Sequence, residues 1–374
     1  MKQNRFIVLL VIIAFGFTNC QRSKPNIYYQ KKYVKEIKQA RKEAGFFISR
    51  NFIPGSSVAI FLKNELIYSE GFGLASTDLE VPVTRKTKFR IGDLSELYTS
   101  ALYLKLLDEG LLNEDSAIQK YYPQFPEKED TITPKFLAYE IAGIRKPTAE
   151  EQLRKGMNTG LERSIDRFKN DPLIVQPGTY QIPSIFNYNL LGVVMEKASG
   201  KRFAKLFQEY ITDTLHLENT CIDNPFISIK NRSDFFETNL ISQVVFGQFY
   251  DLRQNAPSEG MLSNAEDLAK LGNDLLHSDY FSGIRDKIFQ NIVLENGQQA
   301  GMANAWTTYT DHEERLVYGR QGTVPGGGGS IIIYPEYELI IAFTCNLTAS
   351  LDETPVFSMA LPFLPKTQQE TENK

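Results

Sequence analysis

Three stretches of the chain have helical patterns of apolar and polar residues. Residues 93–110 and 264–276 repeat apolar side chains every three or four positions, and residues 29–46 consist largely of strong helix formers. We therefore predict helices over these stretches and over the apolar segment 190–200. The middle of the chain, about 111–300, is expected to be mostly helical with breaks at proline and glycine.

Strand patterns lie near both ends of the chain. Residues 57–63 and 65–73, separated by Asn64, predict an antiparallel hairpin, and residues 330–335 and 338–346 predict a second one. Strands at both ends with a helical segment between them favour one sheet assembled from the two ends, with a helical subdomain beside it. The expected fold class is α+β.

The first twenty residues have the features of a bacterial export signal. A basic start leads into an apolar run at 6–17 and then Cys20. The run is too short to span a bilayer but suits the apolar part of a signal peptide. A cysteine at this place resembles the lipid-modified residue of a bacterial lipoprotein; an ordinary secretory signal with an incidental cysteine is the alternative. We predict lipid on Cys20, attachment to a membrane, and a cell-envelope protein that faces the periplasm.

Composition excludes several classes of protein. With 42% hydrophobic and 23% charged residues, the chain is neither disordered nor fibrous. Its net charge of −4 gives no basic surface for nucleic acid, so none is expected as a partner. The three histidines lack metal-ligand spacing, and the run Gly326–Gly329 precedes a strand and not a helix, so neither a metal nor a nucleotide cofactor is predicted. Cys221 and Cys345 are expected to be free thiols.

Several motifs follow one another between residues 36 and 362. They read PGSSVAIF, YSEGFGLAS, ITPKFLAYEIAG, PGTYQIPSIFNYNLLG, SEGMLSNAEDLAKLG and GRQGTVPGGGGS. Their order resembles the serine β-lactamase and penicillin-binding-protein family, in its branch of class C β-lactamases, DD-peptidases and esterases. The resemblance implies a five-stranded antiparallel sheet flanked by helices, with a pocket between the sheet and a helical subdomain. The expected organisation is a signal peptide (1–19), a lipid-anchored tether (20–35), a β-lactamase-like domain (36–365) and a polar tail (366–374).

The first catalytic motif of that family is substituted here. Its nucleophilic serine and the lysine that activates it are spaced S-x-x-K at the start of a helix, so that both lie on one face. The matching positions hold Asp93 and Glu96. A carboxylate supplies neither an alkoxide nucleophile nor an amine base.

The remaining motifs are substituted as well. The family's Y-x-N motif reads Pro183-Ser184-Ile185, which has no acid or base at the tyrosine position. The strand motif K-T-G or H-x-G reads Arg320-Gln321-Gly322, which keeps the glycine and a cation able to bind a carboxylate. The H-T-S-G stretch reads EIAG at 140–143.

Three substituted motifs inside matching packing stretches favour a family fold without the family's reaction. We therefore expect a pseudoenzyme that binds a peptide, a cell-wall fragment or a protein partner. The alternative is an active esterase, peptidase or β-lactamase with rearranged residues. Ser95 is the displaced nucleophile to consider, although two residues along a helix turn it about 200° away from residue 93. Ser184 is a weaker candidate because no basic residue adjoins it.

Asp93 and Glu96 admit more than one interpretation. D-x-x-E before an apolar run is the pattern of a capping box, and acidic residues are favoured at a helix N-terminus. The same pair could also bind a ligand, act as an acid and base, or hold a metal. We further expect Arg320 to pair with one of them. Such a pair would close the pocket that the family uses, or change which ligand the pocket accepts. The candidate pocket residues are Asp93, Glu96, Pro183, Ser184, Ile185, Arg320 and Gly322.

Overall fold

One large antiparallel sheet organises the protein. The computed structural model describes residues 26–152, 160–348 and 354–365, and within them nine strands join in the order β1-β3-β2-β14-β13-β12-β11-β10, with β4 paired to β3. The strands are β1 (Ile27–Tyr29), β2 (Gly55–Leu62), β3 (Glu65–Ser76), β4 (Val81–Pro82), β10 (Met302–Ala303), β11 (Trp306–Thr310), β12 (Leu316–Val324), β13 (Gly327–Tyr334) and β14 (Leu339–Cys345).

The expected number of five strands was wrong for this sheet. Strands β2, β3, β12, β13 and β14 have seven residues or more, and short strands extend the sheet beyond them. Both predicted hairpins are confirmed, as β2–β3 and β13–β14, and β14 pairs with β2 to join the two ends of the chain. The tetraglycine segment does not simply lead into a strand, because Gly327–Gly329 already belong to β13.

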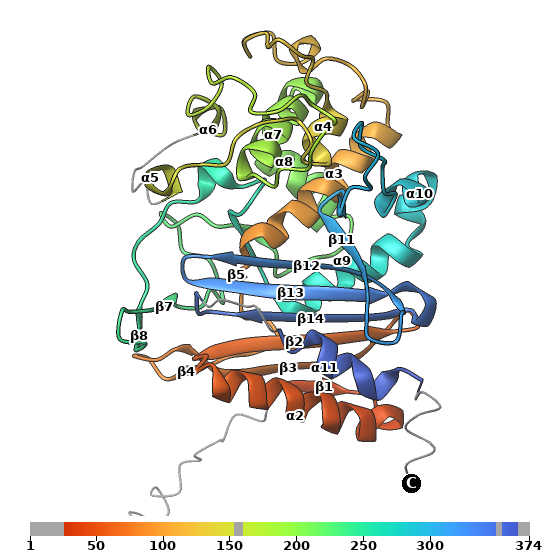
Figure 1. The fold of residues 1–374 in the computed structure, drawn as a ribbon. Coiled ribbons are helices and arrows are strands. Elements are labelled where there is room, and N and C mark those ends of the chain that lie inside the picture. The colour runs from red at the N-terminus through yellow and green to blue at the C-terminus, as the bar shows by residue number, and fades with distance from the viewer. Residues whose placement is uncertain (1–25, 153–159, 349–353, 366–374) are drawn as a thin grey trace, which may run out of the picture.

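Helices cover the sheet on both faces (Figure 1). The helices α2 (Val34–Arg50) and α11 (Val356–Ala360) pack on one face, where they share a core with Phe343 and Ile341. The other face carries α9 (Ala265–His277) and, beyond it, the helical subdomain. The remaining helices are α3 (Ser95–Asp108), α4 (Pro134–Ala138), α5 (Ala149–Gln152), α6 (Glu162–Ile165), α7 (Ile185–Ser199), α8 (Phe203–Phe207) and α10 (Arg285–Ile288).

The predicted helices are confirmed with shifted ends. The helix expected at 29–46 begins only at Val34, because the preceding residues form β1 and a short 3-10 turn. Helix α9 begins as the sequence indicates: the Asn264 side chain accepts a hydrogen bond from Asp267 N at 2.8 Å. The expectation that the middle of the chain is mostly helical was wrong, because most of its described residues lie in loops. It also contains the strands β6 (Cys221–Ile222), β7 (Phe236–Thr238), β8 (Val244–Phe246) and β9 (Met261–Ser263). Strand β9 lies between β6 and β5 (Phe89–Arg90) and pairs with both.

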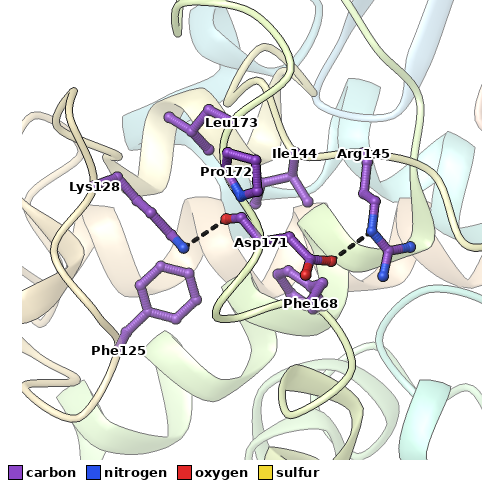
Figure 2. A pocket seen from close by; sticks show the side chains of 8 residues that line it. All are labelled: Phe125, Lys128, Ile144, Arg145, Phe168, Asp171, Pro172 and Leu173. Carbon is purple, nitrogen blue, oxygen red and sulfur yellow. Dashed lines mark hydrogen bonds and ion pairs between the residues drawn. The ribbon is translucent and has the colours of Figure 1, made fainter.

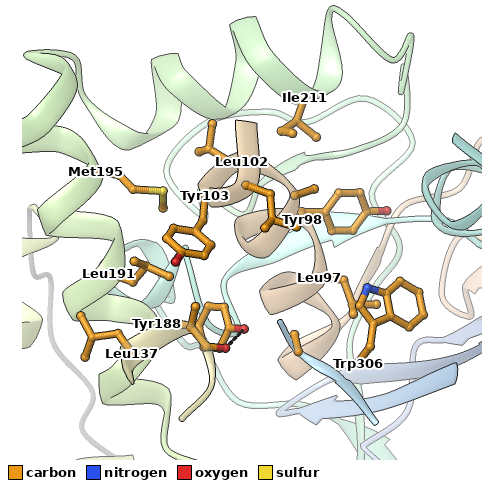
Figure 3. Packing of buried hydrophobic residues seen from close by; sticks show 14 of the residues in the cluster. Leu97, Tyr98, Leu102, Tyr103, Leu137, Tyr188, Leu191, Met195, Ile211 and Trp306 are labelled. Carbon is orange, nitrogen blue, oxygen red and sulfur yellow. Dashed lines mark hydrogen bonds between the residues drawn. The ribbon is translucent and has the colours of Figure 1, made fainter. Parts of the chain in front are cut away.

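Helix α3 runs through the centre of the subdomain core. Figure 3 shows Tyr103 beside Leu191 and Met195 of α7, and Leu97 beside Trp306 of β11. Trp306 belongs to this core and is 1% exposed. This packing fixes the start of α3 against the sheet, where the candidate site lies.

Several sequence predictions fall outside the described residues. The signal peptide, Cys20 and the tail 366–374 are among them. Within the described residues, no helix is long and apolar enough to cross a membrane. Cys221 and Cys345 are both free thiols, as expected.

Candidate functional site

Two glycines bring the start of α3 into backbone contact with strand β12. Before α3 the chain makes a 3-10 turn, η2 (Gly92–Leu94), in which Gly92 has a φ of +54°. A Cβ on Gly322 would lie 2.8 Å from Asp93 N, and one on Gly92 would lie 2.5 Å from Thr323 O. Only glycine permits this approach. Gly322 of the strand motif therefore has a structural role, because it allows β12 to lie directly against residue 93.

The Asp93 carboxylate turns back onto this junction. Backbone N–H groups of Thr323 and of Asp93 itself donate hydrogen bonds to it and lower its pKa, as does the Arg320 charge, but the larger effect is burial, which raises the pKa. The capping-box interpretation was therefore wrong. Asp93 lies inside the 3-10 turn, and neither η2 nor α3 has a side-chain hydrogen bond at its N-cap.

Glu96 forms the expected ion pair with Arg320. Its Oε2 accepts from Arg320 Nη2, and the two side chains are 2% and 11% exposed. Arg320 Nη1 also contacts Met302 Sδ. Burial raises the pKa of Glu96 well above its usual range, and Arg320 opposes this effect. Burial alone would lower the pKa of Arg320, but Glu96, Glu140 and Asp93 raise it further than burial lowers it.

Glu140 is a third carboxylate in the same cluster. It occupies the first position of the EIAG stretch, has a φ of +55°, and is 1% exposed. Its Oε1 accepts a hydrogen bond from Ser184 N at 2.8 Å, whereas Oε2 is buried without a partner. Burial raises the pKa of Glu140 to about 7, against the opposing charge of Arg320.

Glu259 adds a fourth carboxylate from the loop before β9. Its Oε1 accepts from Asn255 Nδ2 at 2.6 Å. Burial raises the pKa of Glu259 to about 7, and the negative charge of Asp93 contributes to the increase. Asp93, Glu96 and Glu140 therefore surround the Arg320 guanidinium, while Glu259 acts on the cluster through Asp93. The Arg320 charge faces three carboxylates, so the site is short of positive charge.

The hydroxyl groups near the site form hydrogen bonds with backbone groups and not with the acidic side chains. Ser95 is fully buried, and its Oγ accepts from Met261 N at 3.2 Å. Ser184 Oγ donates to Arg145 O at 2.8 Å and caps α7. Tyr188, whose pKa burial raises well above its usual range, donates to Ala138 O at 3.0 Å. None of these hydroxyls has a side-chain base as its hydrogen-bond partner.

Two hydrogen bonds join the loop that replaces the Y-x-N motif to Glu140. Ile182 N donates to Glu140 O at 2.7 Å, next to the Ser184 N bond to the same residue's carboxylate. Pro183 is exposed and Ile185 is half-buried at the first position of α7. The loop thus keeps its position beside the site while presenting apolar side chains.

Two cavities lie away from this cluster. A space of only ≈ 10 Å³, room for about one water, lies in the subdomain between Phe125, Lys128, Arg145 and Asp171 (Figure 2). A larger one of ≈ 160 Å³ lies where β11–β13 meet α11 and includes Gln321 and Ser330 in its wall. Arg320 contributes to that wall from its strand, but its guanidinium points to Glu96 on the opposite side.

Comparisons with known proteins identify the family. The model of the Beta-lactamase family matches residues 37–356. The chain belongs to the Beta-lactamase family. "Protein flp" of Staphylococcus aureus (strain NCTC 8325 / PS 47) is 25% identical over 307 residues, which cover 81% of this chain and 61% of that protein. The Homo sapiens "Serine beta-lactamase-like protein LACTB, mitochondrial" is 26% identical over 329 residues, covering 70% of this chain and 60% of the human protein.

Solved structures show the same fold. A class C beta-lactamase has a TM-score of 0.75 and 16% identity, with 91% of this chain and 100% of that one covered. The octameric penicillin-binding protein homologue from Pyrococcus abyssi has a TM-score of 0.73 and 20% identity, with 87% and 76% covered. The chain spans about three fifths of the length of the curated relatives it matches. The similarity therefore shows the family and the fold.

Sequence analysis missed half of the acidic cluster. It identified Asp93, Glu96 and Arg320, but not Glu140 or Glu259 as site residues. Glu140 carried a signal, because it lies at the start of a family motif that was otherwise lost. Glu259 lies in the quoted stretch SEGMLSNAEDLAKLG, but nothing in that stretch indicated that its side chain lies near Asp93.

Proposed function

We propose that this Beta-lactamase family member is a lipid-anchored protein of the bacterial cell envelope that binds a ligand without hydrolysing it. The ligand is a peptide, a cell-wall fragment or a loop of a partner protein. The observation that carries the proposal is the replacement of the nucleophile and base by Asp93 and Glu96, with Glu96 paired to Arg320 in a buried site.

The state of the backbone donors supports this proposal. Two convergent backbone N–H groups stabilise the oxyanion that develops during acyl transfer. Here the N–H groups of Asp93 and Thr323 bind the Asp93 carboxylate. An acyl group would have to displace a negative charge from these donors, and no freed hydroxyl would then attack it.

The charge of the site supports the same conclusion. Three carboxylates around one guanidinium disfavour the entry of an anionic substrate, because like charges repel strongly where water is excluded. The ligand group that this site accepts is therefore expected to be neutral or cationic. This requirement separates the proposed ligand from acyl compounds that carry a carboxylate.

The absence of a covalent intermediate is the first testable consequence. We expect the purified protein to show no mass increase after incubation with a penicillin or with a fluorophosphonate, because no side chain in the site is an activated nucleophile. Intact-protein mass spectrometry measures this directly, with an active serine β-lactamase as the positive control. A stoichiometric adduct would instead establish the rearranged hydrolase, and its position would identify Ser95, Ser184 or another hydroxyl as the nucleophile.

Lipid attachment gives a second test. In a bacterial host supplied with a labelled fatty acid, the full chain is expected to take up label, whereas the Cys20→Ala variant is not, because the acyl chains attach at that residue. Gel fluorography of the two proteins measures the difference. Cys221→Ala is the matched control, since it removes a different cysteine and should leave labelling unchanged. Equal labelling of Cys20→Ala and the native protein would show that lipid is not attached at this residue.

A further inference from the structure

An uncharged apolar hairpin projects from one end of the sheet. Residues 238–250 read TNLISQVVFGQFY and contain no charged side chain. They include β8 and the turn that joins it to β7. The exposed apolar side chains of this segment are Leu240 (106%), Ile241 (73%), Phe249 (59%), Phe246 (51%) and Val245 (39%).

Hydrogen bonds within the turn hold the backbone that presents these side chains. The Asn239 side-chain oxygen accepts hydrogen bonds from Ile241 N at 3.1 Å and Gln243 N at 2.9 Å, and Asn239 N donates to Gln243 O at 2.9 Å. These bonds hold Leu240 and Ile241 at the tip of the turn. Their exposure is therefore a property of the turn's own hydrogen bonding.

The base of the hairpin is anchored to the domain. Phe236 is buried, its N donates to Asn346 O at 2.8 Å, and its ring lies 5.1 Å from that of Phe246. Asn346 follows the last residue of β14, which pairs with Ser56 at the start of β2. The hairpin thus extends from the end of the sheet where β2 begins and β3 ends, and Figure 1 shows β7 and β8 close to β4 there.

The N-terminus approaches this end of the molecule. Ile27 in β1 lies opposite Glu70, and β3 continues from there to Ser76 near the hairpin. Only five residues lie between Cys20 and Asn26, a reach of about 20 Å even when fully extended. A lipid on Cys20 would therefore hold this part of the protein close to the bilayer surface.

We propose that the tip of the β7–β8 hairpin inserts into the membrane to which Cys20 is attached. Each large apolar side chain that leaves water contributes roughly 1.5–3 kcal/mol. Because acyl chains already supply attachment, the hairpin's contribution is to fix the orientation of the domain on the membrane. This inference rests on the proposed lipid anchoring.

A bilayer suits this surface better than a second copy of the chain. A stable protein interface buries about 800 Å² on each partner, and its core is surrounded by a polar rim. The hairpin offers a narrow projection of five side chains, which a fluid phase accommodates without a matching pocket. Residues 238–250 contain no basic side chain that would need anionic lipid, so a zwitterionic lipid surface is expected to suffice.

A tryptophan at the tip tests the proposal. The chain has one native tryptophan, Trp306, which is buried and serves as a constant background. The full-length, lipid-modified protein carrying Leu240→Trp is reconstituted into phosphatidylcholine–phosphatidylethanolamine vesicles, with and without bromine on the acyl chains. The added fluorescence is expected to shift to shorter wavelength and to be roughly halved by the brominated lipid, since the tip lies at the acyl boundary.

Val293→Trp is the matched control. Val293 is 66% exposed and precedes β10, at the edge of the sheet opposite β1, so its tryptophan should not be quenched. If the protein floats with the vesicles and Leu240→Trp is quenched no more than Val293→Trp, the hairpin proposal is wrong and the anchoring stands. A blue shift without lipid that depends on protein concentration would assign the tip to a second copy and overturn the proposal. Protein that stays in solution would overturn both.

Discussion

Replacing Arg320 with methionine is expected to lower the free energy of unfolding by about 3–5 kcal/mol at pH 8, because the change leaves buried carboxylates without their cation. Glu96 is 2% exposed and has its ion pair only with Arg320 among the described residues. Asp93 and Glu140 are also stabilised as anions by the same guanidinium. Urea unfolding followed by circular dichroism measures the loss.

The size of the loss should depend on pH. Without Arg320, the pKa of Glu96 rises further, so protonation relieves the buried charge as the solution becomes more acidic. The loss at pH 5 is therefore expected to be smaller than at pH 8. The double variant Arg320→Met/Glu96→Gln should recover part of the lost stability, because it removes the uncompensated charge.

A solvent-exposed ion pair provides the control. Lys32 and Glu65 are 3.1 Å apart with 56% and 57% of their side chains exposed. Lys32→Met should leave the free energy of unfolding almost unchanged, as is typical of exposed pairs. If Arg320→Met costs as little as Lys32→Met at pH 8, the Arg320–Glu96 pair does not hold the site together.

The sheet and the main helices were predictable because their signals are local. Nearly continuous apolar runs in β2, β13 and β14 suit strands that are buried on both faces of a covered sheet, and Asn264 is a residue type that favours the N-cap position it occupies in α9. The short outer strands were not predictable in this way. Strands of two or three residues such as β10 are fixed by the neighbour they pair with, and so they carry little pattern of their own.

The hairpin β7–β8 lay within a segment expected to be mostly helical. Its sequence contained a usable signal, since Val244, Val245 and Phe246 are β-branched or aromatic and follow an asparagine turn. The long middle segment around it, with its clear helices, obscured a strand pair of three residues on each side. Here the local propensity was correct and the regional pattern was misleading.

The candidate site shows why a motif does not fix the role of its side chains. D-x-x-E before an apolar run predicts a capping box, but Asp93 instead binds backbone N–H groups at the junction with β12, and Glu96 binds Arg320. Thr323, which binds Asp93, and Arg320, which binds Glu96, both come from a strand more than two hundred residues later in the chain. Local sequence cannot distinguish a cap from a tertiary ion pair when the same acidic residues serve both.

Substituting Glu140 with glutamine is expected to stabilise the protein increasingly as pH rises. An ordinary glutamate has a pKa of about 4.3, whereas burial raises the pKa of Glu140 to about 7. Between these values the folded protein keeps a proton that the unfolded chain has released, so this group's contribution to stability falls as pH rises and is lost above about pH 7. Glu140→Gln stays neutral throughout. Its stability relative to the native protein should therefore grow by about 3 kcal/mol between pH 4 and pH 8.

Urea unfolding of both proteins across this pH range measures that growth, and Glu313→Gln is the matched control. Glu313 is exposed, so its replacement removes no buried carboxylate and controls for the change of residue type. Oε1 of a glutamine at position 140 can still accept the hydrogen bond from Ser184 N, which keeps the 182–184 loop in place. If the Glu140→Gln difference is constant from pH 4 to pH 8, Glu140 is already ionised in the folded state. Arg320 would then face ionised carboxylates on both Glu96 and Glu140, and the site would hold more surplus negative charge for a cationic ligand group.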